Sequence, residues 1–570
     1  MPNWIEQADA QLSALLADWS LLTTLIALTL LAFVAYPIFY AAEPDTHPLL
    51  LARQSTASPI RQKNESSVYR SPEVPYGYPL KTGLNVKDVG APRWASGKDG
   101  DLRDVWREVQ RGGSVGEDGK AVPQGSIMTV LGKEEVVEHG VEEMSKEIDV
   151  IGKHLSQAGV KKVAIYLPNS VEYLQTIFAC AFYGLTPILL PYNQPHQKVY
   201  DLVNATGADA LICAAGNLPL DAVAKHCQNL HLLTWVVEKT SRHMDWNGVP
   251  DAAHDRLSVS VWHDIIAEQK TSASAALPTN EQGAKPGDLI TVTQPSNNPQ
   301  AKPEIVTFTQ ANLVAATAAL ITTLPLRQRF TPADLVLPAD AFTHTYVLCQ
   351  TLAALFTHAS LAINSVAGPG VDLALASRSI SPTVIIASAE TLAAIHTTGT
   401  AGISSAAQKL GKYTQAQAMS AGRMPTDNML FRVLSPSATA SGNAPGKLRL
   451  ILVAERVGGG SPALSSTTLS DLRIFTRARI CYALTAPQVA GAIAQTNVFD
   501  YRRVDGGGHS HFGTPLSSVE VKLVAGEDGN VAGNTPRGEM VVMGPAVSGG
   551  GEVRLPVQGR VRVDGTLGYA

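Results

Sequence analysis

Apolar and polar residues alternate along the middle of this chain in a strand–helix pattern. Residues 162–167 form a short apolar run typical of a buried strand, and a helix is expected from about Ser170 to Tyr183. Gly184 ends that helix, and residues 187–191 form the next apolar strand. Strands and helices joined by such short connections predict a mostly parallel, doubly wound sheet. The predicted fold class is therefore α/β.

Residues 21–42, from Leu21 to Ala42, form a long apolar run without a charged residue. Aromatic side chains lie near its end. Roughly 20 apolar residues are needed to cross a bilayer. The run therefore predicts a single transmembrane helix, with a buried helix of a soluble core as the alternative. Arg53, Arg61 and Lys63 follow it. Basic residues tend to remain on the cytosolic side, so the bulk of the chain is expected in the cytosol.

A polar loop with three prolines, Gln294 to Pro303, separates two further strand patterns. The first is the β-branched run 289–293, and the second is 305–308. Thr309 is a suitable N-cap for a helix that begins near Gln310. Strand, polar loop, strand and helix are thus expected in that order.

Composition divides the chain into segments. Residues 240–285 and 397–446 are polar and rich in Ala, Ser and Gly, which is typical of surface insertions. The predicted organisation is a short acidic N-terminal segment (1–20), the transmembrane helix (21–42), a linker (43–100), an α/β domain (101–495) and a smaller β-rich subdomain of it (496–570).

Overall composition excludes several classes of protein. Forty-five per cent hydrophobic and 16% charged residues are typical of a globular protein with a large core. The net charge of −4 and the lack of a basic stripe argue against a nucleic-acid partner. The five cysteines show no CxxC spacing, so we expect buried thiols in a reducing compartment.

The polar loop and its surroundings resemble the acyl-adenylating (AMP-binding) superfamily. In that family the loop reads roughly T-S-G-T-T-G-x-P-K-G-V and is followed by T-H-x-N-L. Here Pro303, Val306 and residues 309–313 keep this frame. The block VAIYLPNSVEYLQTIFACAFYGLTPILLPYNQP is also similar to the first half of long-chain acyl-CoA synthetases. The resemblance implies an acyl-CoA synthetase-like large N-terminal domain with mixed, mostly parallel sheets and flanking helices.

The residues that carry chemistry in that family differ here. A phosphate-binding loop needs glycines whose N–H groups can approach oxygen closely. In this chain residues 297–301 replace them, and Pro299 has no N–H to donate. Glu304 replaces the family lysine. Lys302 lies one residue away from the position that matches the family lysine. If the protein is an active ligase, Lys302 is the cation that it would use.

Two further family motifs are incomplete. Residues 479–486 match Y-G-x-T-E, and Tyr482 and Thr485 are the family-matched remnants of the nucleotide pocket. Ala486 replaces the glutamate that helps to hold magnesium, and Arg560 replaces the aspartate that binds ribose. The family's C-terminal lid is not found before the sequence ends.

Histidines offer two further interpretations. His509 and His511 could ligate a metal, but no third ligand accompanies them. His344 lies near the family's aromatic-histidine position in a segment that resembles the lining of the acyl pocket. His344 and Cys349 could form a nucleophilic pair, but no third group orients them. Packing is the favoured interpretation in both cases.

The combined losses predict a membrane-anchored, catalytically inactive pseudoenzyme. It would have a lipid-binding or scaffold role in fatty-acid metabolism, at the endoplasmic reticulum or lipid droplets, with a fatty-acyl ligand and protein partners that the sequence does not define. No catalytic residue, metal or cofactor is expected. The first alternative is a divergent active long-chain fatty acid–CoA ligase, which would need ATP, Mg and coenzyme A. The second is a structural membrane adaptor.

Overall fold

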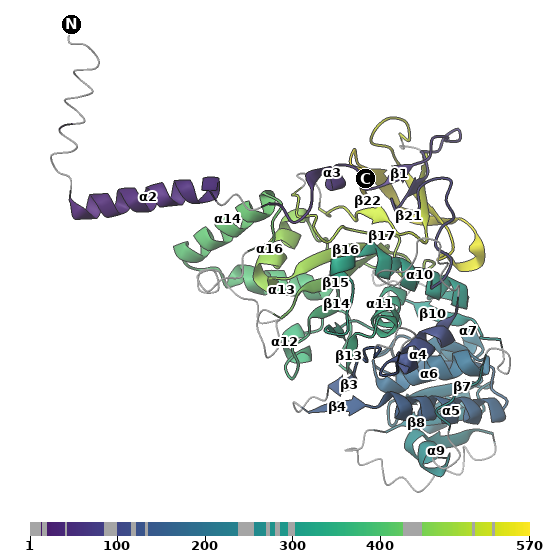
Figure 1. The fold of residues 1–570 in the computed structure, drawn as a ribbon. Coiled ribbons are helices and arrows are strands. Elements are labelled where there is room, and N and C mark those ends of the chain that lie inside the picture. The colour runs from purple at the N-terminus through teal and green to yellow at the C-terminus, as the bar shows by residue number, and fades with distance from the viewer. Residues whose placement is uncertain are drawn as a thin grey trace. The chain divides into compact units, whose positions relative to one another are not determined.

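The structure is a computed structural model, shown as a ribbon in Figure 1, and the chain divides into two compact units, Met1–His47 and Pro48–Ala570. The described residues are 13, 20–39, 43–84, 100–115, 121–130, 135–237, 256–269, 274–279, 285–294, 302–425, 447–503, 508–526 and 530–570, without the side chains of 33–39.

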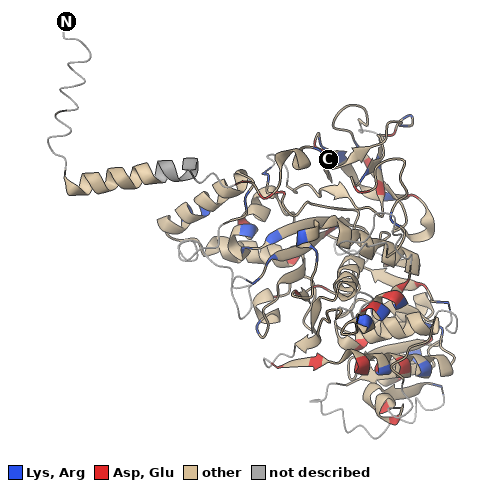
Figure 2. Cartoon of the chain, in the orientation of Figure 1, with Lys and Arg blue, Asp and Glu red and all other residues tan. Residues whose placement is uncertain are grey.

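The first unit contains helix α2 (Leu21–Phe39), which covers most of the predicted membrane span. Its sequence has no basic or acidic residue, and its described part is uniformly tan in Figure 2. Among the residues that the structure describes, no helix combines the length and the apolar character needed to cross a bilayer. The transmembrane helix predicted over residues 21–42 is therefore not confirmed.

The second unit contains a seven-stranded sheet in the order β11-β10-β6-β5-β7-β8-β9. All neighbouring strands are parallel except β10 and β11, which are antiparallel. The bounds are β5 (Lys162–Tyr166), β6 (Thr186–Leu189), β7 (Ala210–Ala214), β8 (Leu232–Val236), β9 (Ser258–Val261), β10 (Leu289–Thr293) and β11 (Glu304–Phe308).

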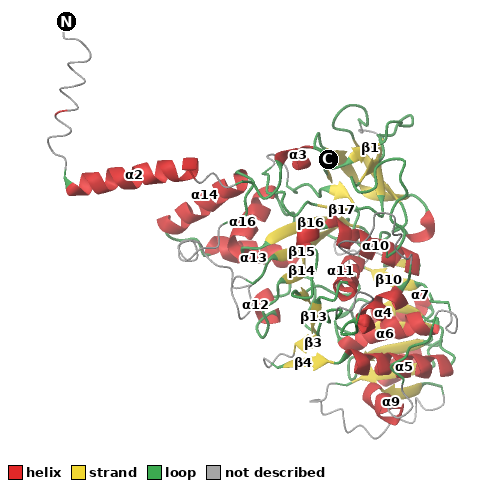
Figure 3. Cartoon of the chain, viewed as in Figure 1, coloured by secondary structure: helices red, strands yellow, loops and turns green. Residues whose placement is uncertain are grey.

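Helices cover both faces of this sheet (Figure 3). Val163 and Ile165 of β5 belong to a large core that includes residues of α5 (Val141–Gln157) and α6 (Val171–Tyr183). The intervening Ala164 and Tyr166 belong to a second core with residues of α7 (His196–Thr206) and α8 (Leu220–His226). Successive side chains of a strand point to opposite faces, so β5 is apolar throughout because both faces are buried.

A second, nine-stranded sheet has the order β18-β17-β16-β15-β14-β12-β13-β3-β4. The strands from β16 to β3 are parallel, and the pairs at both ends are antiparallel. The bounds are β3 (Ile127–Val130), β4 (Val136–His139), β12 (Leu335–Pro338), β13 (Ser360–Asn364), β14 (Val384–Ser388), β15 (Leu450–Arg456), β16 (Arg479–Thr485), β17 (Ala494–Gln495) and β18 (Thr514–Pro515).

The third sheet is antiparallel and six-stranded, in the order β1-β2-β19-β20-β21-β22. Its strands are β1 (Thr56–Ala57), β2 (Tyr69–Arg70), β19 (Glu520–Val524), β20 (Arg537–Met543), β21 (Val553–Val561) and β22 (Leu567–Tyr569). Most of it lies in the part predicted to be β-rich. Its first two strands come from residues 43–100, the predicted linker.

The remaining helices complete the second unit, and α10 and α11 contribute many residues to the large core. They are α3 (Pro48–Ala52), α4 (Leu102–Arg111), α9 (Trp262–Gln269), α10 (Gln310–Thr323), α11 (Thr345–Phe356), α12 (Leu373–Ala376), α13 (Ala389–Ala401), α14 (Ala406–Ser420) and α16 (Ser466–Thr476). The prediction of an α/β fold with mixed, mostly parallel sheets is confirmed.

Local predictions around the polar loop are also confirmed. Strands β10 and β11 occupy the two predicted patterns, and α10 begins at Gln310. Thr309 caps α10: its hydroxyl accepts from the Asn312 N–H at 3.2 Å, and the Asn312 side chain accepts from the Thr309 N–H at 2.8 Å. Residues 295–301 of the loop lie outside the described part of the chain.

Candidate functional site

A cavity of about 850 Å³ lies where strands of the two large sheets end. Its walls come from the segments that follow β6, β12, β13 and β15, from the ends of β10 and β16, and from part of β21. The carboxyl ends of parallel strands are the usual ligand-binding edge of α/β sheets. Pockets of roughly 300–1,000 Å³ hold small organic ligands. The cavity is therefore the candidate site.

Asn169 helps to fix one wall of this cavity. It follows β5, and its side-chain amide donates to the carbonyl oxygen of Asp340 at 2.9 Å. The amide oxygen of Asn169 accepts from the N–H of Phe342, also at 2.9 Å. Because Asn169 is buried, these bonds tie the segment after β12 to the end of β5. The two large sheets are thereby joined at the cavity.

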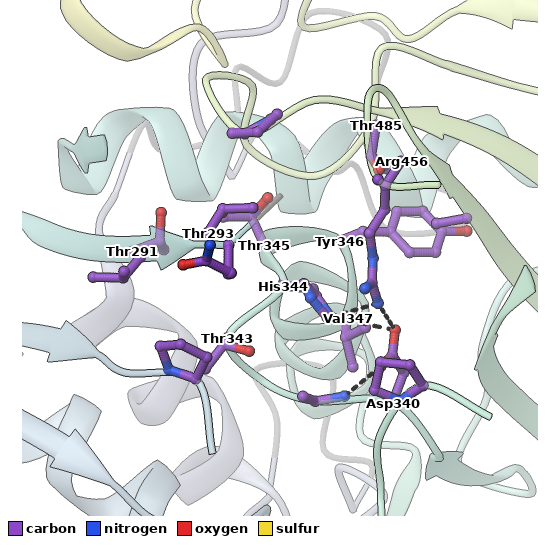
Figure 4. Close-up of a pocket in the computed structure, with 18 of the residues that line it drawn as sticks. Thr291, Thr293, Asp340, Thr343, His344, Thr345, Tyr346, Val347, Arg456 and Thr485 are labelled. Atoms are coloured by element: carbon purple, nitrogen blue, oxygen red, sulfur yellow. Dashed lines mark hydrogen bonds and ion pairs between the residues drawn. The ribbon is translucent and has the colours of Figure 1, made fainter. Parts of the chain in front are cut away.

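Asp340, His344 and Arg456 form a charged cluster in the wall (Figure 4). Arg456 ends β15, and its Nη2 donates both to Oδ2 of Asp340 and to Nδ1 of His344, the latter at 2.7 Å. Burial alone would raise the pKa of Asp340, but Arg456 and His344 hold it well below its ordinary value. Asp340 is therefore ionised and paired with Arg456.

The same contacts fix the proton of His344. Burial, followed by the charge of Arg456, lowers the pKa of His344, so the ring is neutral at pH 7. A guanidinium can only donate, so Nδ1 is the acceptor and the proton is on Nε2. Within the described residues Nε2 has no hydrogen-bond partner. His344 therefore offers an N–H to a ligand.

Threonines supply further polar groups to the cavity (Figure 4). Thr345 donates to the carbonyl oxygen of Val489 at 3.3 Å. Thr291 of β10 is 1% exposed, and its hydroxyl has no hydrogen-bond partner in the described part of the chain. A buried hydroxyl without a partner is uncommon in native proteins. Thr291 is accordingly a second group that a bound ligand would satisfy.

Glu304 brings a carboxyl group to the cavity from the start of β11. Its Oε1 accepts a hydrogen bond from the side chain of Gln488, which also lines the cavity. Burial raises the pKa of Glu304, and the bond from Gln488 partly opposes that rise. Lys302, two residues earlier, is exposed and is not among the lining residues.

The two predicted nucleotide-pocket residues have different positions. Thr485 ends β16 and lines the cavity, and its hydroxyl donates to the carbonyl oxygen of Glu455 at 2.9 Å. Ala486 also lines the cavity. Tyr482 is fully buried and is not among the lining residues, and its hydroxyl donates to Oε2 of Glu455 at 2.8 Å. Its ring packs on Phe512.

Glu455 is the buried partner of Tyr482. Burial raises its pKa to about 7, while the hydrogen bond from Tyr482 opposes part of that rise. Nε2 of His509 lies 3.6 Å from the second carboxyl oxygen of Glu455, Oε1. Burial lowers the pKa of His509. Glu455 is thus a buried carboxyl group beside the cavity with a pKa of about 7.

His509 and His511 do not converge on a common point. Nδ1 of His511 accepts from the N–H of Gly513 at 3.1 Å, and its Nε2 lies 3.4 Å from Oδ2 of Asp500. Burial lowers the pKa of His511 to about 4. The described ranges contain no group of three or more His, Cys, Asp or Glu residues placed to hold a metal ion.

Two other sequence candidates lie apart from the cavity. Cys349 is buried, its thiol contacts the carbonyl oxygen of Leu313, and burial raises its pKa to about 12. His344 instead contacts Arg456 and Asp340, so the two do not pair. Arg560 is on β21, opposite Arg537, and is not among the lining residues.

Asp340 and Arg456 are the site residues that sequence reasoning missed. Asp340 lies two residues after the buried apolar strand β12, and Arg456 is the last residue of the buried apolar strand β15. A charged residue at the carboxyl end of such a strand is a signal that could have identified both, because ligands bind at that edge.

Comparisons with known proteins agree with this fold. The family model for the AMP-binding enzyme matches residues 135–550. No curated protein matches the sequence.

Solved structures with a similar fold include a long-chain fatty-acid–CoA ligase from Archaeoglobus fulgidus, with 13% identity and a TM-score of 0.57, covering 86% of each chain. An anthranilate–CoA ligase in complex with anthranoyl-AMP has 13% identity and a TM-score of 0.56, covering 82% of this chain and 76% of that one. The inhibitor-bound N-terminal domain of FACL13 from Mycobacterium tuberculosis has 15% identity and a TM-score of 0.56, covering 82% of this chain and 99% of that domain.

Proposed function

Because the chain belongs to the family of AMP-binding enzymes, we propose that its cavity binds an acyl ligand and that the protein does not adenylate that ligand. One observation carries the proposal: Glu304 and Ala486 line the same cavity. The family resemblance assigns these two positions to a phosphate-binding lysine and to a magnesium-holding glutamate. An acid therefore occupies the place of a cation, and a methyl group occupies the place of a metal ligand.

The energetic consequence is large. Losing one group that stabilises charge in a transition state costs about 3 kcal/mol. Two such losses together lower the rate by roughly four powers of ten, since each 1.4 kcal/mol is a factor of ten. Glu304 adds an unfavourable interaction with a triphosphate. The two lost interactions and the added repulsion support the proposal that the protein has no measurable adenylation activity.

Acyl binding is supported by the polar groups that remain. The N–H of His344 at Nε2 and the hydroxyl of Thr291 are donors without partners among the described residues. A carboxylate accepts hydrogen bonds and matches such donors. Val347 and Val371 add apolar lining. A fatty acid with its carboxylate toward His344 fits this combination and would serve a lipid-binding or scaffold role in fatty-acid metabolism.

An active fatty acid–CoA ligase is the second candidate. The cavity lies at the carboxyl ends of parallel strands and is large enough for a ligand, which favours this candidate. Lys302 beside the loop would then have to supply the missing cation. Such an enzyme would bind ATP, Mg and coenzyme A, whereas the pseudoenzyme would bind the fatty acid alone. A structural adaptor would bind none of them.

Membrane attachment is a separate part of the proposal and is supported by the uncharged run of residues 21–42. We propose that this run attaches the protein to the endoplasmic reticulum or to lipid droplets, with the rest of the chain in the cytosol. Cell fractionation with and without residues 1–42 tests it. Recovery of both forms in the soluble fraction would contradict the proposed membrane attachment and would leave the ligand proposal unaffected.

Thermal unfolding of the full chain tests the ligand proposal. A ligand that binds the folded state raises the melting temperature. We expect a rise with a long-chain fatty acid and no rise with Mg-ATP or coenzyme A. A rise with Mg-ATP would favour the ligase, and no rise with any of them would favour the adaptor.

A further inference from the structure

The turn that joins β21 to β22 carries an exposed apolar residue. Residues 562–565 form this turn, which is closed by a hydrogen bond from the N–H of Gly565 to the carbonyl oxygen of Arg562 at 2.9 Å. Val563 lies within the turn and is 80% exposed. Tight turns usually hold Gly, Pro, Asn, Asp or Ser at such positions. A valine there leaves apolar surface in contact with solvent.

Helix α3 adds apolar side chains close to this turn. The N–H of Gln54 donates to the carbonyl oxygen of Asp564 at 2.8 Å, so the turn packs against the residues that follow α3. Within α3, Leu51 is buried, whereas Leu49 and Leu50 are 72% and 64% exposed. Figure 1 shows α3 beside β22. Exposed apolar side chains from two segments that are far apart in sequence therefore lie in one region of the surface.

Arginines gather on the face of the sheet that leads to the turn. Arg560 and Arg562 are two residues apart, so their side chains lie on the same face. Nε of Arg562 lies 3.9 Å from the place that a Cβ atom on Gly568 would occupy, so this glycine leaves room for the arginine. Arg537 of β20 is directly opposite Arg560, an arrangement that is unfavourable for like charges. Burial and then the charge of Arg560 lower the pKa of Arg562.

Neither Arg560 nor Arg562 has a carboxylate partner of its own among the described residues. Asp500 and Asp564, the acids nearest to Arg562, both form ion pairs with Arg502. Nε of Arg560 and Nη1 of Arg562 are buried and make no hydrogen bond within the described part of the chain. Both side chains are partly exposed, so an anion outside the protein can reach the two guanidinium groups. Such an anion would relieve the repulsion between them.

A bilayer that contains anionic phospholipids matches both the apolar and the basic side chains. Arginine binds phosphate oxygens with two N–H groups at once, and lipid phosphates lie at the level of the headgroups. The boundary between headgroups and acyl chains accepts exposed leucine and valine side chains. A free phosphate would contact the arginines but would leave the apolar residues in water. The bilayer is therefore the partner that uses all of these residues.

We propose that a bilayer with anionic phospholipids docks on the second unit, at a surface made of two apolar and two basic side chains: Leu50, Val563, Arg560 and Arg562. The apolar side chains enter the boundary between headgroups and acyl chains, and the arginines bind lipid phosphates. Only five residues, 43–47, separate α3 from the uncharged run of residues 21–42. The inference goes beyond the proposed attachment through that run, because the folded second unit itself makes this contact.

A fluorescent probe in the turn tests this docking surface in the full chain. The five native cysteines are buried, so the cysteine of Val563→Cys can be labelled selectively with nitrobenzoxadiazole, whose emission shifts to shorter wavelength inside a bilayer. Val563 is far in sequence from residues 21–42, so attachment through that run does not by itself insert the probe. We expect a shift on vesicles of phosphatidylcholine with phosphatidylserine and none on phosphatidylcholine alone. The same probe on Leu375→Cys, an exposed position of α12 that lies apart from α3 in Figure 1, should stay in water.

Arg562→Gln tests the contribution of charge. One basic residue near an anionic bilayer changes an equilibrium by about fivefold. At saturating vesicles, the ratio of inserted to water-exposed probe should therefore fall about fivefold in this variant. Arg554→Gln is the matched control, because Arg554 lies near the opposite end of β21 and has Glu539 as its partner at 3.9 Å. The control removes the same charge and should leave the ratio unchanged.

Co-sedimentation of the same samples with vesicles measures the attachment separately. A chain that co-sediments while its Val563 probe stays in water overturns the inference and leaves the attachment through residues 21–42 in place. Absence of both signals contradicts the attachment as well. An equal shift on uncharged vesicles, or an equal loss in both arginine variants, also overturns the inference. A shift that needs no vesicles and grows with protein concentration would assign this surface to a second copy of the chain and not to a bilayer.

Discussion

Nη2 of Arg456 lies 2.7 Å from Nδ1 of His344 and also donates to Oδ2 of Asp340. The arginine thus neutralises a buried acid and fixes the histidine with its proton on Nε2. Asp340, which follows β12, and Arg456, which ends β15, prepare a donor for a ligand from two strands that are separated by β14 in the sheet. The arrangement makes Arg456 a positioning residue of the cavity.

Arg456→Met should destabilise the protein by about 3 kcal/mol, because it leaves the buried carboxylate of Asp340 without its cation. Denaturant unfolding at neutral pH measures the loss. The double variant Asp340→Asn/Arg456→Met should recover much of it, since no buried charge then remains. Equal losses in the single and double variants would show that Arg456 acts through packing alone.

Glu455 should make stability depend on pH. Its pKa is raised from 4.5 to about 7 in the folded protein, so the folded state holds the proton more tightly than the unfolded state. The stabilisation is complete below about pH 4.5 and is lost as the pH rises through about 7.

The measurement is the difference in free energy of unfolding between Glu455→Gln and the parent protein. We expect the difference to move in favour of the variant by on the order of 2 kcal/mol between pH 5 and pH 8. Comparing the two proteins cancels the contribution of His511, which faces Asp500 and not Glu455 and whose pKa burial lowers. A flat difference would show that Glu455 is ionised throughout.

Tyr482→Phe should separate stability from ligand binding. The variant removes the hydroxyl that donates to Glu455, which costs roughly 1–2 kcal/mol for a buried acceptor. Affinity for a fatty acid should not change, because Tyr482 is not among the residues that line the cavity. Calorimetric titration checks this, and an affinity loss with unaltered stability would place the tyrosine in the site.

Glu304→Lys should increase the affinity for Mg-ATP. Reversing the charge in the cavity replaces repulsion of a triphosphate by attraction, and even about 1.4 kcal/mol gives a tenfold change. Glu142→Lys is the control, since Glu142 is an exposed carboxylate on α5 that does not line the cavity. The same gain in both variants would mean that net charge, and not the position of Glu304, determines nucleotide binding.

The sheet elements were accessible from the sequence because their signals are local. The run at residues 289–293, the cap at Thr309 and the turn at Gly184, with φ of +72°, each depend on neighbours only a few residues away. The resemblance to the AMP-binding superfamily then predicted the overall fold.

The site was less accessible because it depends on contacts between distant segments. Arg456 meets Asp340 across 116 positions of sequence, and Asn169 meets Phe342 across 173. Tyr482 illustrates the converse: it matches a family motif, yet its hydroxyl bonds to Glu455 and its side chain is fully buried. Periodicity reports that a residue is buried but not which distant side chain it contacts.

The most direct test of the account is detection of acyl-adenylate by mass spectrometry, with the purified full chain in excess over long-chain fatty acid and Mg-ATP. The account predicts that fatty acid binds and that neither acyl-adenylate nor pyrophosphate appears. Formation of acyl-adenylate in a single turnover, abolished by removal of Mg, would contradict it and establish the protein as an active ligase.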